Sequence, residues 1–479
     1  MIRIYLDWNI FTLLKTQCES VAGLNEIIKN NKDKLQFVYT DAHFEDLMRS
    51  YSPENDKFVE DLKNMDYICN DYLLLHQDNN AEPLVAKPSE YFEQAVKPYI
   101  DMSFDKVVEK MANSPQRDKD YEKDILDNLI DLQKSFFDKQ DTFVAENVYQ
   151  ENPYLQKLLP HFSKDDTQWD TIAQALHSFN RLLNDKEFYK NIRGEVKNQD
   201  KKRLLAKSNN WSSTQLFENL DQITSSYLGK DKSFIEIVLD AAANTEKQTL
   251  LEAFTSIYLT LDILGIRQDK LPKKNNTTMN IVTDSKHSYY AAYCDYFVVL
   301  DKNLSFKSKS IYSYCKVDTK VVTPKELIED LNLVIHSPND ILELLKSSND
   351  AVNPKNIFFD ETEPQHENLY LFKLPFFMLN HFNYALSLEM KENYQVIFRR
   401  AYKNFSYFSY YQEEINVVKE VFRLVQHQTN DLEKESEDFV HNRGYHKSYK
   451  WIINDFLRIY LIREEDTERV SMIIETRKL

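Results

Sequence analysis

Glycine is scarce in this chain, which has five glycines among 479 residues. They stand at Gly23, Gly194, Gly229, Gly265 and Gly444. No two are close enough to form the glycine-rich loop that cradles phosphates in P-loop NTPases and dinucleotide-binding enzymes, so the sequence argues against both classes. The scarcity also favours helices over turn-rich β structure.

Cysteine and long apolar runs are also rare. The four cysteines, Cys18, Cys69, Cys294 and Cys315, are too scattered for a zinc motif and too few for a disulfide framework. The sequence shows no run of eighteen or more apolar residues and no secretory segment at its start. We therefore expect no membrane partner and a reducing, cytoplasmic location.

Negative charge exceeds positive charge, and the net charge of −16 argues against a surface that binds nucleic acid as a whole. A local basic groove stays compatible with this balance. The chain length predicts two or three domains, and 42% hydrophobic with 28% charged residues is typical of globular proteins.

Two short apolar runs near the start of the chain lead into acidic residues. Ile2–Leu6 is followed by Asp7 and Asn9, and Leu35–Tyr39 is followed by a helical segment that contains Glu45. Such runs are typical of strands buried in a parallel sheet. Open α/β sheets place their sites at the carboxyl ends of these strands.

A later stretch repeats the arrangement. It predicts a strand at Asn280–Thr283, a helix at Ser285–Cys294 that starts beside Asp284, and a buried strand at Tyr296–Leu300 that leads to Asp301. If helix and strand pack as one unit, both aspartates approach the same edge of the sheet.

A last strand and helix are predicted in the segment KVVTPKELIEDL. Thr323 is placed to cap the helix, Pro324 to occupy its first position, and Glu326 to complete a capping box.

Together these segments resemble the PIN-domain nucleases. The matching motifs are YLDWN, HFEDL, TDSKH and CDYFVVLDKNL, which contain Asp7, Glu45, Asp284 and Asp301 in that order. The resemblance implies an α/β fold with a central, mostly parallel sheet, and a metal-dependent nuclease in which these four acidic residues are catalytic and hold Mg²⁺ or Mn²⁺. The chain departs from the family at Val299, where Thr or Ser is usual, and in a long insertion.

The position of Glu45 has two alternatives, because Asp41 and Asp46 lie beside it on the same predicted helix. Asn9 is expected to orient Asp7 or a metal-bound water.

Two further residues are secondary candidates. His287 is predicted to share a helix face with Asp284 and is a candidate for substrate contact, although a lone histidine is more often a packing or hydrogen-bonding residue. Asp295 closes the predicted helix, and the resemblance implies a structural role for it.

The chain divides into four predicted parts. A PIN-like domain at 1–50 and 234–337 is split by a helical insertion at 51–233 and followed by a helical C-terminal domain at 338–479. Two basic groups are candidates for binding nucleic acid, with a solvated surface as the alternative: Lys201, Lys202 and Arg203 in the insertion, and Lys273 and Lys274 before Asp284.

The sequence thus predicts a metal-dependent endoribonuclease of PIN type that hydrolyses RNA phosphodiester bonds. A structure-specific DNA nuclease and a catalytically silent scaffold are the alternatives. The helical additions are expected to gate the site, to recognise a substrate such as structured RNA, or to mediate assembly as a homo-oligomer or with a regulatory protein partner. By analogy they suit a bacterial toxin or a phage-defence nuclease.

Overall fold

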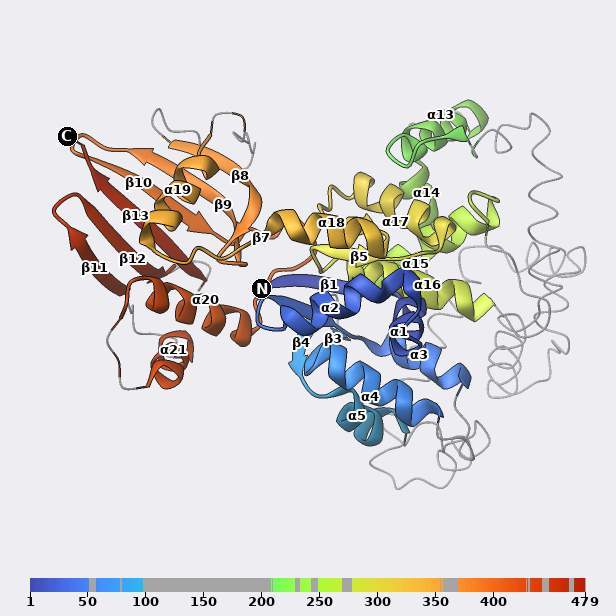
Figure 1. The fold of residues 1–479 in the computed structure, drawn as a ribbon. Coiled ribbons are helices and arrows are strands. Elements are labelled where there is room, and N and C mark those ends of the chain that lie inside the picture. The colour runs from blue at the N-terminus through green and yellow to red at the C-terminus, as the bar shows by residue number, and fades with distance from the viewer. Residues whose placement is uncertain are drawn as a thin grey trace, which may run out of the picture.

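The computed structural model contains a mixed α/β domain and a second domain built on an antiparallel sheet (Figure 1). It describes residues 1–50, 57–97 and 208–478, apart from gaps at 78–79, 209, 229–232, 243–248, 269–277, 354, 356–368, 428, 430, 442–447 and 465–468. None of the helices in these ranges combines the length and apolar character needed to cross a membrane. The candidate basic residues Lys201, Lys202, Arg203, Lys273 and Lys274 lie outside the described residues.

A four-stranded parallel sheet forms the centre of the first domain. Its order is β2-β1-β5-β6, with β1 at Ile2–Leu6, β2 at Leu35–Val38, β5 at Tyr296–Val298 and β6 at Lys320–Val322. Strand β1 therefore pairs with β5, which follows it by almost three hundred residues, and Ile4 lies opposite Tyr296. The mixed α/β fold with a parallel sheet is as predicted.

Helices cover both faces of this sheet (Figure 1). Side chains alternate along β1, so Ile2, Ile4 and Leu6 enter one hydrophobic core while Tyr5 enters the other. The first core is completed by side chains from α1 (Trp8–Lys15), α2 (Ala22–Asn30), the short η1 (Glu19–Val21), α4 (Lys57–Cys69) and α18 (Pro324–Val334). The second is completed by α13 (Leu216–Leu228), α14 (Phe234–Ala242), α15 (Leu250–Ile263), α16 (Thr278–Ala291) and α17 (Lys302–Tyr314).

Helix α18 begins as its sequence predicts. The Thr323 hydroxyl accepts the backbone N–H of Glu326, and the Glu326 carboxylate accepts the N–H of Thr323, with Pro324 at the first helical position. The capping box is confirmed.

The segment expected as a helical insertion contains strands as well as helices. After α3 (Asp41–Ser50) and α4, the hairpin of β3 (Tyr72–Gln77) and β4 (Asn80–Val85) extends the parallel sheet through a bridge from Tyr39 to Leu73. The described part continues with α5 (Pro88–Tyr91) and η2 (Phe92–Val96). This part of the insertion therefore belongs to the first domain.

The predicted strand at Asn280–Thr283 is wrong, because these residues lie inside α16. The β-branched residues Ile281, Val282 and Thr283 suggested a strand. Helix α16 contacts α3, α15, α17, β1 and β5, so it is covered on several sides and shows no simple apolar stripe.

The prediction of a helical C-terminal domain is also wrong, because a seven-stranded sheet dominates this region (Figure 1). The order is β11-β12-β13-β10-β9-β8-β7, and all pairs except β7 with β8 are antiparallel. The strands are β7 (Ile335–His336), β8 (Leu369–Met378), β9 (Phe382–Glu389), β10 (Asn393–Arg399), β11 (Ser448–Asn454), β12 (Leu457–Arg463) and β13 (Val470–Arg477).

Three helices accompany this sheet, α19 (Ile341–Ala351), α20 (Tyr411–Leu424) and α21 (Leu432–His441). They share one hydrophobic core with the strands. Strand β12 shows the overlooked signal, since Leu457, Ile459 and Leu461 are buried while Arg458 and Tyr460 between them are half-buried. A period of two predicts a strand.

Arg3 joins the two domains. Its side chain is 1% exposed, and its Nε donates to Glu413 Oε1 at 2.5 Å. The remaining guanidinium nitrogens donate to Ser406 Oγ at 2.9 Å, to the Phe408 carbonyl at 2.8 Å and to the Tyr402 hydroxyl at 3.0 Å. Arg3, in the central strand β1, is thus hydrogen-bonded to the segment between β10 and α20.

Replacing Glu413 tests this link. Glu413→Gln leaves the buried guanidinium of Arg3 without a counter-charge, so we expect the free energy of unfolding to fall by about 3–5 kcal/mol. Urea titration with tryptophan fluorescence measures it. The matched control is Glu329→Gln, which removes an exposed partner of Lys325 and should cost less than about 1 kcal/mol. Equal losses in the two variants would contradict the role given to Arg3.

Candidate acidic site

The carboxyl ends of β1, β2 and β5 meet at one edge of the parallel sheet. Asp7 follows β1 directly, α3 starts three residues after β2, and Asp301 follows β5 by three residues. The backbone N–H of Asp7 donates to the Val298 carbonyl at 3.0 Å, which ties the end of β1 to the end of β5. This edge therefore gathers the acidic residues that the sequence places after strands.

Asp7 is a buried carboxylate, 2% exposed. It stands at the N-cap position of α1, yet its side chain makes no capping hydrogen bond. Instead, Asn9 Nδ2 donates to Asp7 Oδ2 at 3.0 Å, as the role expected for Asn9 requires. Burial raises the pKa of Asp7, the charge of Asp46 raises it further, and His287 and Asn9 oppose the rise. A cation at this carboxylate would favour its ionised form.

His287 lies at the centre of the cluster and is fully buried. Its Nε2 donates to Asp46 Oδ2 at 2.8 Å, which places the Nε2 proton toward α3. Burial alone would lower the pKa of His287, but the hydrogen bond to Asp46 and the charges of Asp46, Asp7 and Asp284 raise it above its ordinary value. Three carboxylates, which follow β1 or lie in α3 and α16, therefore favour the protonated form of this buried ring.

A buried hydrogen-bonded chain continues from His287 toward the backbone beside Asp7. The Tyr5 hydroxyl lies 2.8 Å from His287 Nδ1 and 2.9 Å from Thr40 Oγ1. The Thr40 N–H donates to His43 Nδ1 at 3.1 Å, so His43 carries its proton on Nε2 and donates it to the Leu6 carbonyl at 2.9 Å. These contacts hold the Nδ1 side of the His287 ring in place.

The expected site residue Glu45 points elsewhere. It pairs with Lys286 and accepts the Thr283 hydroxyl at 2.9 Å. Adjacent residues on a helix project about 100° apart, so α3 cannot present both Glu45 and Asp46 to His287. The structure places Asp46, one of the two alternatives, against His287, and it places Glu45 against Lys286 and Thr283. The other alternative, Asp41, lies 4.0 Å from Lys286 Nζ.

The sequence did not predict the hydrogen-bonded group next to His287, which consists of Tyr5, Thr40 and His43. One signal was available, because His43 and Asp46 are three residues apart and thus project from the same face of α3. The contact of Tyr5 with Thr40 and His287 depends on the sheet order and carries no local signal.

The remaining acidic candidates occupy different places. Asp284 lies in the middle of α16, three residues before His287, and its charge acts on that histidine. Asp301 is exposed and caps α17 by accepting the N–H groups of Asn303 at 2.7 Å and Leu304 at 2.9 Å. It follows the carboxyl end of β5, the strand whose end is tied to Asp7.

Asp295 lies at the opposite, amino end of β5. It accepts the Arg3 N–H at 2.8 Å and two hydrogen bonds from Arg400 Nη2 at 2.7 and 2.8 Å. These contacts give Asp295 a structural role at the boundary between the two domains and separate it from the acidic cluster.

The cluster offers hard oxygen donors rather than a closed metal cage. Within the described ranges, no three His, Cys, Asp or Glu side chains come close enough to enclose an ion by themselves. Carboxylates on separate elements suit an ion that completes its shell with water and substrate oxygens, as Mg²⁺ usually does.

The neutral state of His43 predicts a pH dependence of stability. Burial lowers its pKa to about 3, below the ordinary value of 6.5, so the unfolded chain binds this proton first as the pH falls. Stability is thus lost from about pH 6.5 downward. Between pH 7.5 and 5, urea titrations should show a loss about 2 kcal/mol larger for the wild type than for His43→Gln. Parallel losses would contradict a buried neutral His43.

Comparison of the chain with family models, with curated proteins and with solved structures finds no match. The geometry of the acidic cluster is therefore the basis on which a function can be argued.

Proposed function

We propose that this protein is a metal-dependent endoribonuclease of PIN type. The observation that supports the proposal most strongly is the convergence of Asp7, Asp46 and Asp284 on the buried His287 at the carboxyl edge of a parallel sheet. Gathering carboxylates in a partly desolvated place costs free energy, so such clusters indicate a functional site.

The carboxylates fit a hard divalent cation. Mg²⁺ and Mn²⁺ prefer oxygen ligands, and one or two protein carboxylates are sufficient when water and phosphate supply the rest. Asp7, Asp46 and Asp284 are the residues that would hold the ion, with Asp301 at the rim. When bound, it supplies the Lewis acidity needed to hydrolyse a phosphodiester.

The chain itself provides the positioning. Asn9 fixes the carboxylate of Asp7, and His287 fixes that of Asp46 through a hydrogen bond of 2.8 Å. Because His287 is also held by Tyr5, the ring cannot turn away without breaking a buried contact. Helices α3 and α16 are therefore kept in register around the place where a phosphate would lie.

The first test is cleavage of labelled single-stranded RNA, tRNA and DNA in Mn²⁺, Mg²⁺ or EDTA. We expect RNA cleavage that needs the metal and that falls by at least about 100-fold in the double variant Asp7→Asn, Asp284→Asn, since Asn keeps the shape and removes the charge. Circular dichroism checks that the variant folds. Cleavage of DNA alone would identify a DNA nuclease, and no cleavage by the wild type under any condition would contradict the proposal.

A second test compares neighbouring residues of α3. Asp46→Asn should lose RNA cleavage by at least about 10-fold, because the hydrogen-bond partner of His287 and a carboxylate of the cluster change together. Glu45→Gln, the matched control one residue away, should retain most of the activity, since Glu45 faces Lys286. The reverse outcome would return Glu45 to the site and reject Asp46.

A further inference from the structure

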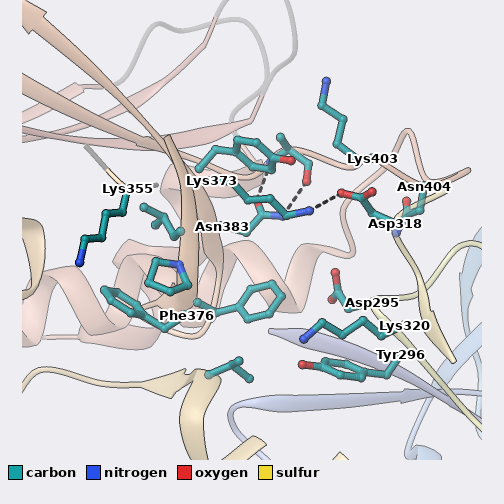
Figure 2. Close-up of a pocket in the computed structure, with 16 residues that line it drawn as sticks. Asp295, Tyr296, Asp318, Lys320, Lys355, Lys373, Phe376, Asn383, Lys403 and Asn404 are labelled. Carbon is teal, nitrogen blue, oxygen red and sulfur yellow. Dashed lines mark hydrogen bonds and ion pairs between the residues drawn. The ribbon is translucent and has the colours of Figure 1, made fainter. Parts of the chain in front are cut away.

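A cavity lies at the amino end of the parallel sheet, on the boundary between the two domains (Figure 2). Its volume is about 440 Å³, within the range of about 300–1,000 Å³ that small-molecule sites occupy. Asp295 and Tyr296 of the first domain line one side, and β8 and β9 of the second domain line the other. The acidic cluster lies beyond the opposite ends of the same strands, so the two places are separate.

The lining of this cavity carries an excess of positive charge. Four lysines and two aspartates contribute to it, the lysines being Lys320, Lys355, Lys373 and Lys403. Both aspartates are already neutralised, Asp295 by the two hydrogen bonds from Arg400 and Asp318 by Lys373 at 2.6 Å. Arg400 offsets Asp295, so the four lysines outnumber Asp318, the one remaining carboxylate among the lining residues, and a bound anion would meet a wall with more positive than negative charge.

Two of these lysines can exchange partners. Lys373 and Asp318 are about half exposed, and Lys320 pairs with Asp330 at 2.8 Å with its own side chain 56% exposed. Exposed ion pairs of this kind contribute little to stability. An ammonium group has three N–H donors, so a phosphate that reaches both lysines would share them with Asp318 and Asp330 through further charge-assisted hydrogen bonds.

Flat apolar side chains form another part of the wall. Phe376, Phe377, Tyr296 and Tyr384 all line the cavity, and Lys320 Nζ lies 5.6 Å from the centre of the Tyr296 ring. Figure 2 shows Lys320 beside Tyr296, with Lys373 directed toward Asp318. Tyr296 and Tyr384 are buried, whereas Phe376 and Phe377 are half-buried, so a planar base linked to a phosphate would pack against the two phenylalanines.

We propose that this cavity binds a nucleotide, with its phosphate on Lys320 and Lys373 and its base against Phe376. A free nucleoside monophosphate and the terminal nucleotide of an RNA strand share this chemistry. The proposal concerns binding alone and is independent of the proposed nuclease activity.

Isothermal titration calorimetry tests it with the full chain. The probes are AMP, GMP, CMP and UMP, and a 5′-phosphorylated RNA tetranucleotide, all in EDTA and in the Asp7→Asn, Asp284→Asn background so that no strand is cut. We expect saturable binding of at least one probe and its displacement by inorganic phosphate. The variant Lys320→Gln, Lys373→Gln should weaken the affinity at least about tenfold, and Phe376→Ala should weaken it as well.

The matched control is Lys325→Gln, Lys346→Gln, which removes the same charge from exposed positions of α18 and α19 outside the cavity and should leave the affinity unchanged. Binding of a mononucleotide assigns the cavity to a free nucleotide, and binding of the tetranucleotide alone assigns it to a strand terminus. No binding of any probe, or equal weakening in both lysine pairs, overturns the proposal. A chain that binds AMP but cleaves nothing would keep it and reject the nuclease.

Discussion

The buried ion pair of Arg3 with Glu413 constrains the whole arrangement, because it anchors the central strand of one domain in the other. Arg3, Tyr5 and Asp7 are alternate residues of one chain segment, and successive contacts place them against the second domain, His287 and the acidic cluster. The extended backbone of this segment fixes the spacing between these three side chains. One short piece of backbone therefore contributes both to the boundary between the domains and to the acidic cluster.

The acidic residues of the cluster and His287 affect each other's pKa values. Asp7 is desolvated and feels the charge of Asp46, so by itself it would tend to bind a proton. The charges of Asp46, Asp7 and Asp284 also raise the pKa of His287, because negative charge favours the protonated ring. Protonation of this ring would place a positive charge among the carboxylates, on a side chain held by hydrogen-bonding contacts on both sides.

Local patterns predicted those parts of the fold that depend on near neighbours. The strands that lead to Asp7 and Asp301 and the start of α18 were predicted because burial, capping and proline act within a few residues. The choice between Glu45 and Asp46 depends on the rotation of α3 relative to α16, which tertiary packing decides. The second domain was missed since its aromatic residues conceal a period of two, and its sheet order is set by distant pairings.

The link between Arg3 and Glu413 also bears on how the chain is made. These residues are 410 positions apart, and β1 pairs with β5 across almost three hundred. At typical rates of synthesis, about 20–80 s pass between the appearance of the two charges. During that time the strand exposes an apolar surface and an arginine without its counter-charge. The native state is therefore completed late in synthesis, once the second domain has emerged.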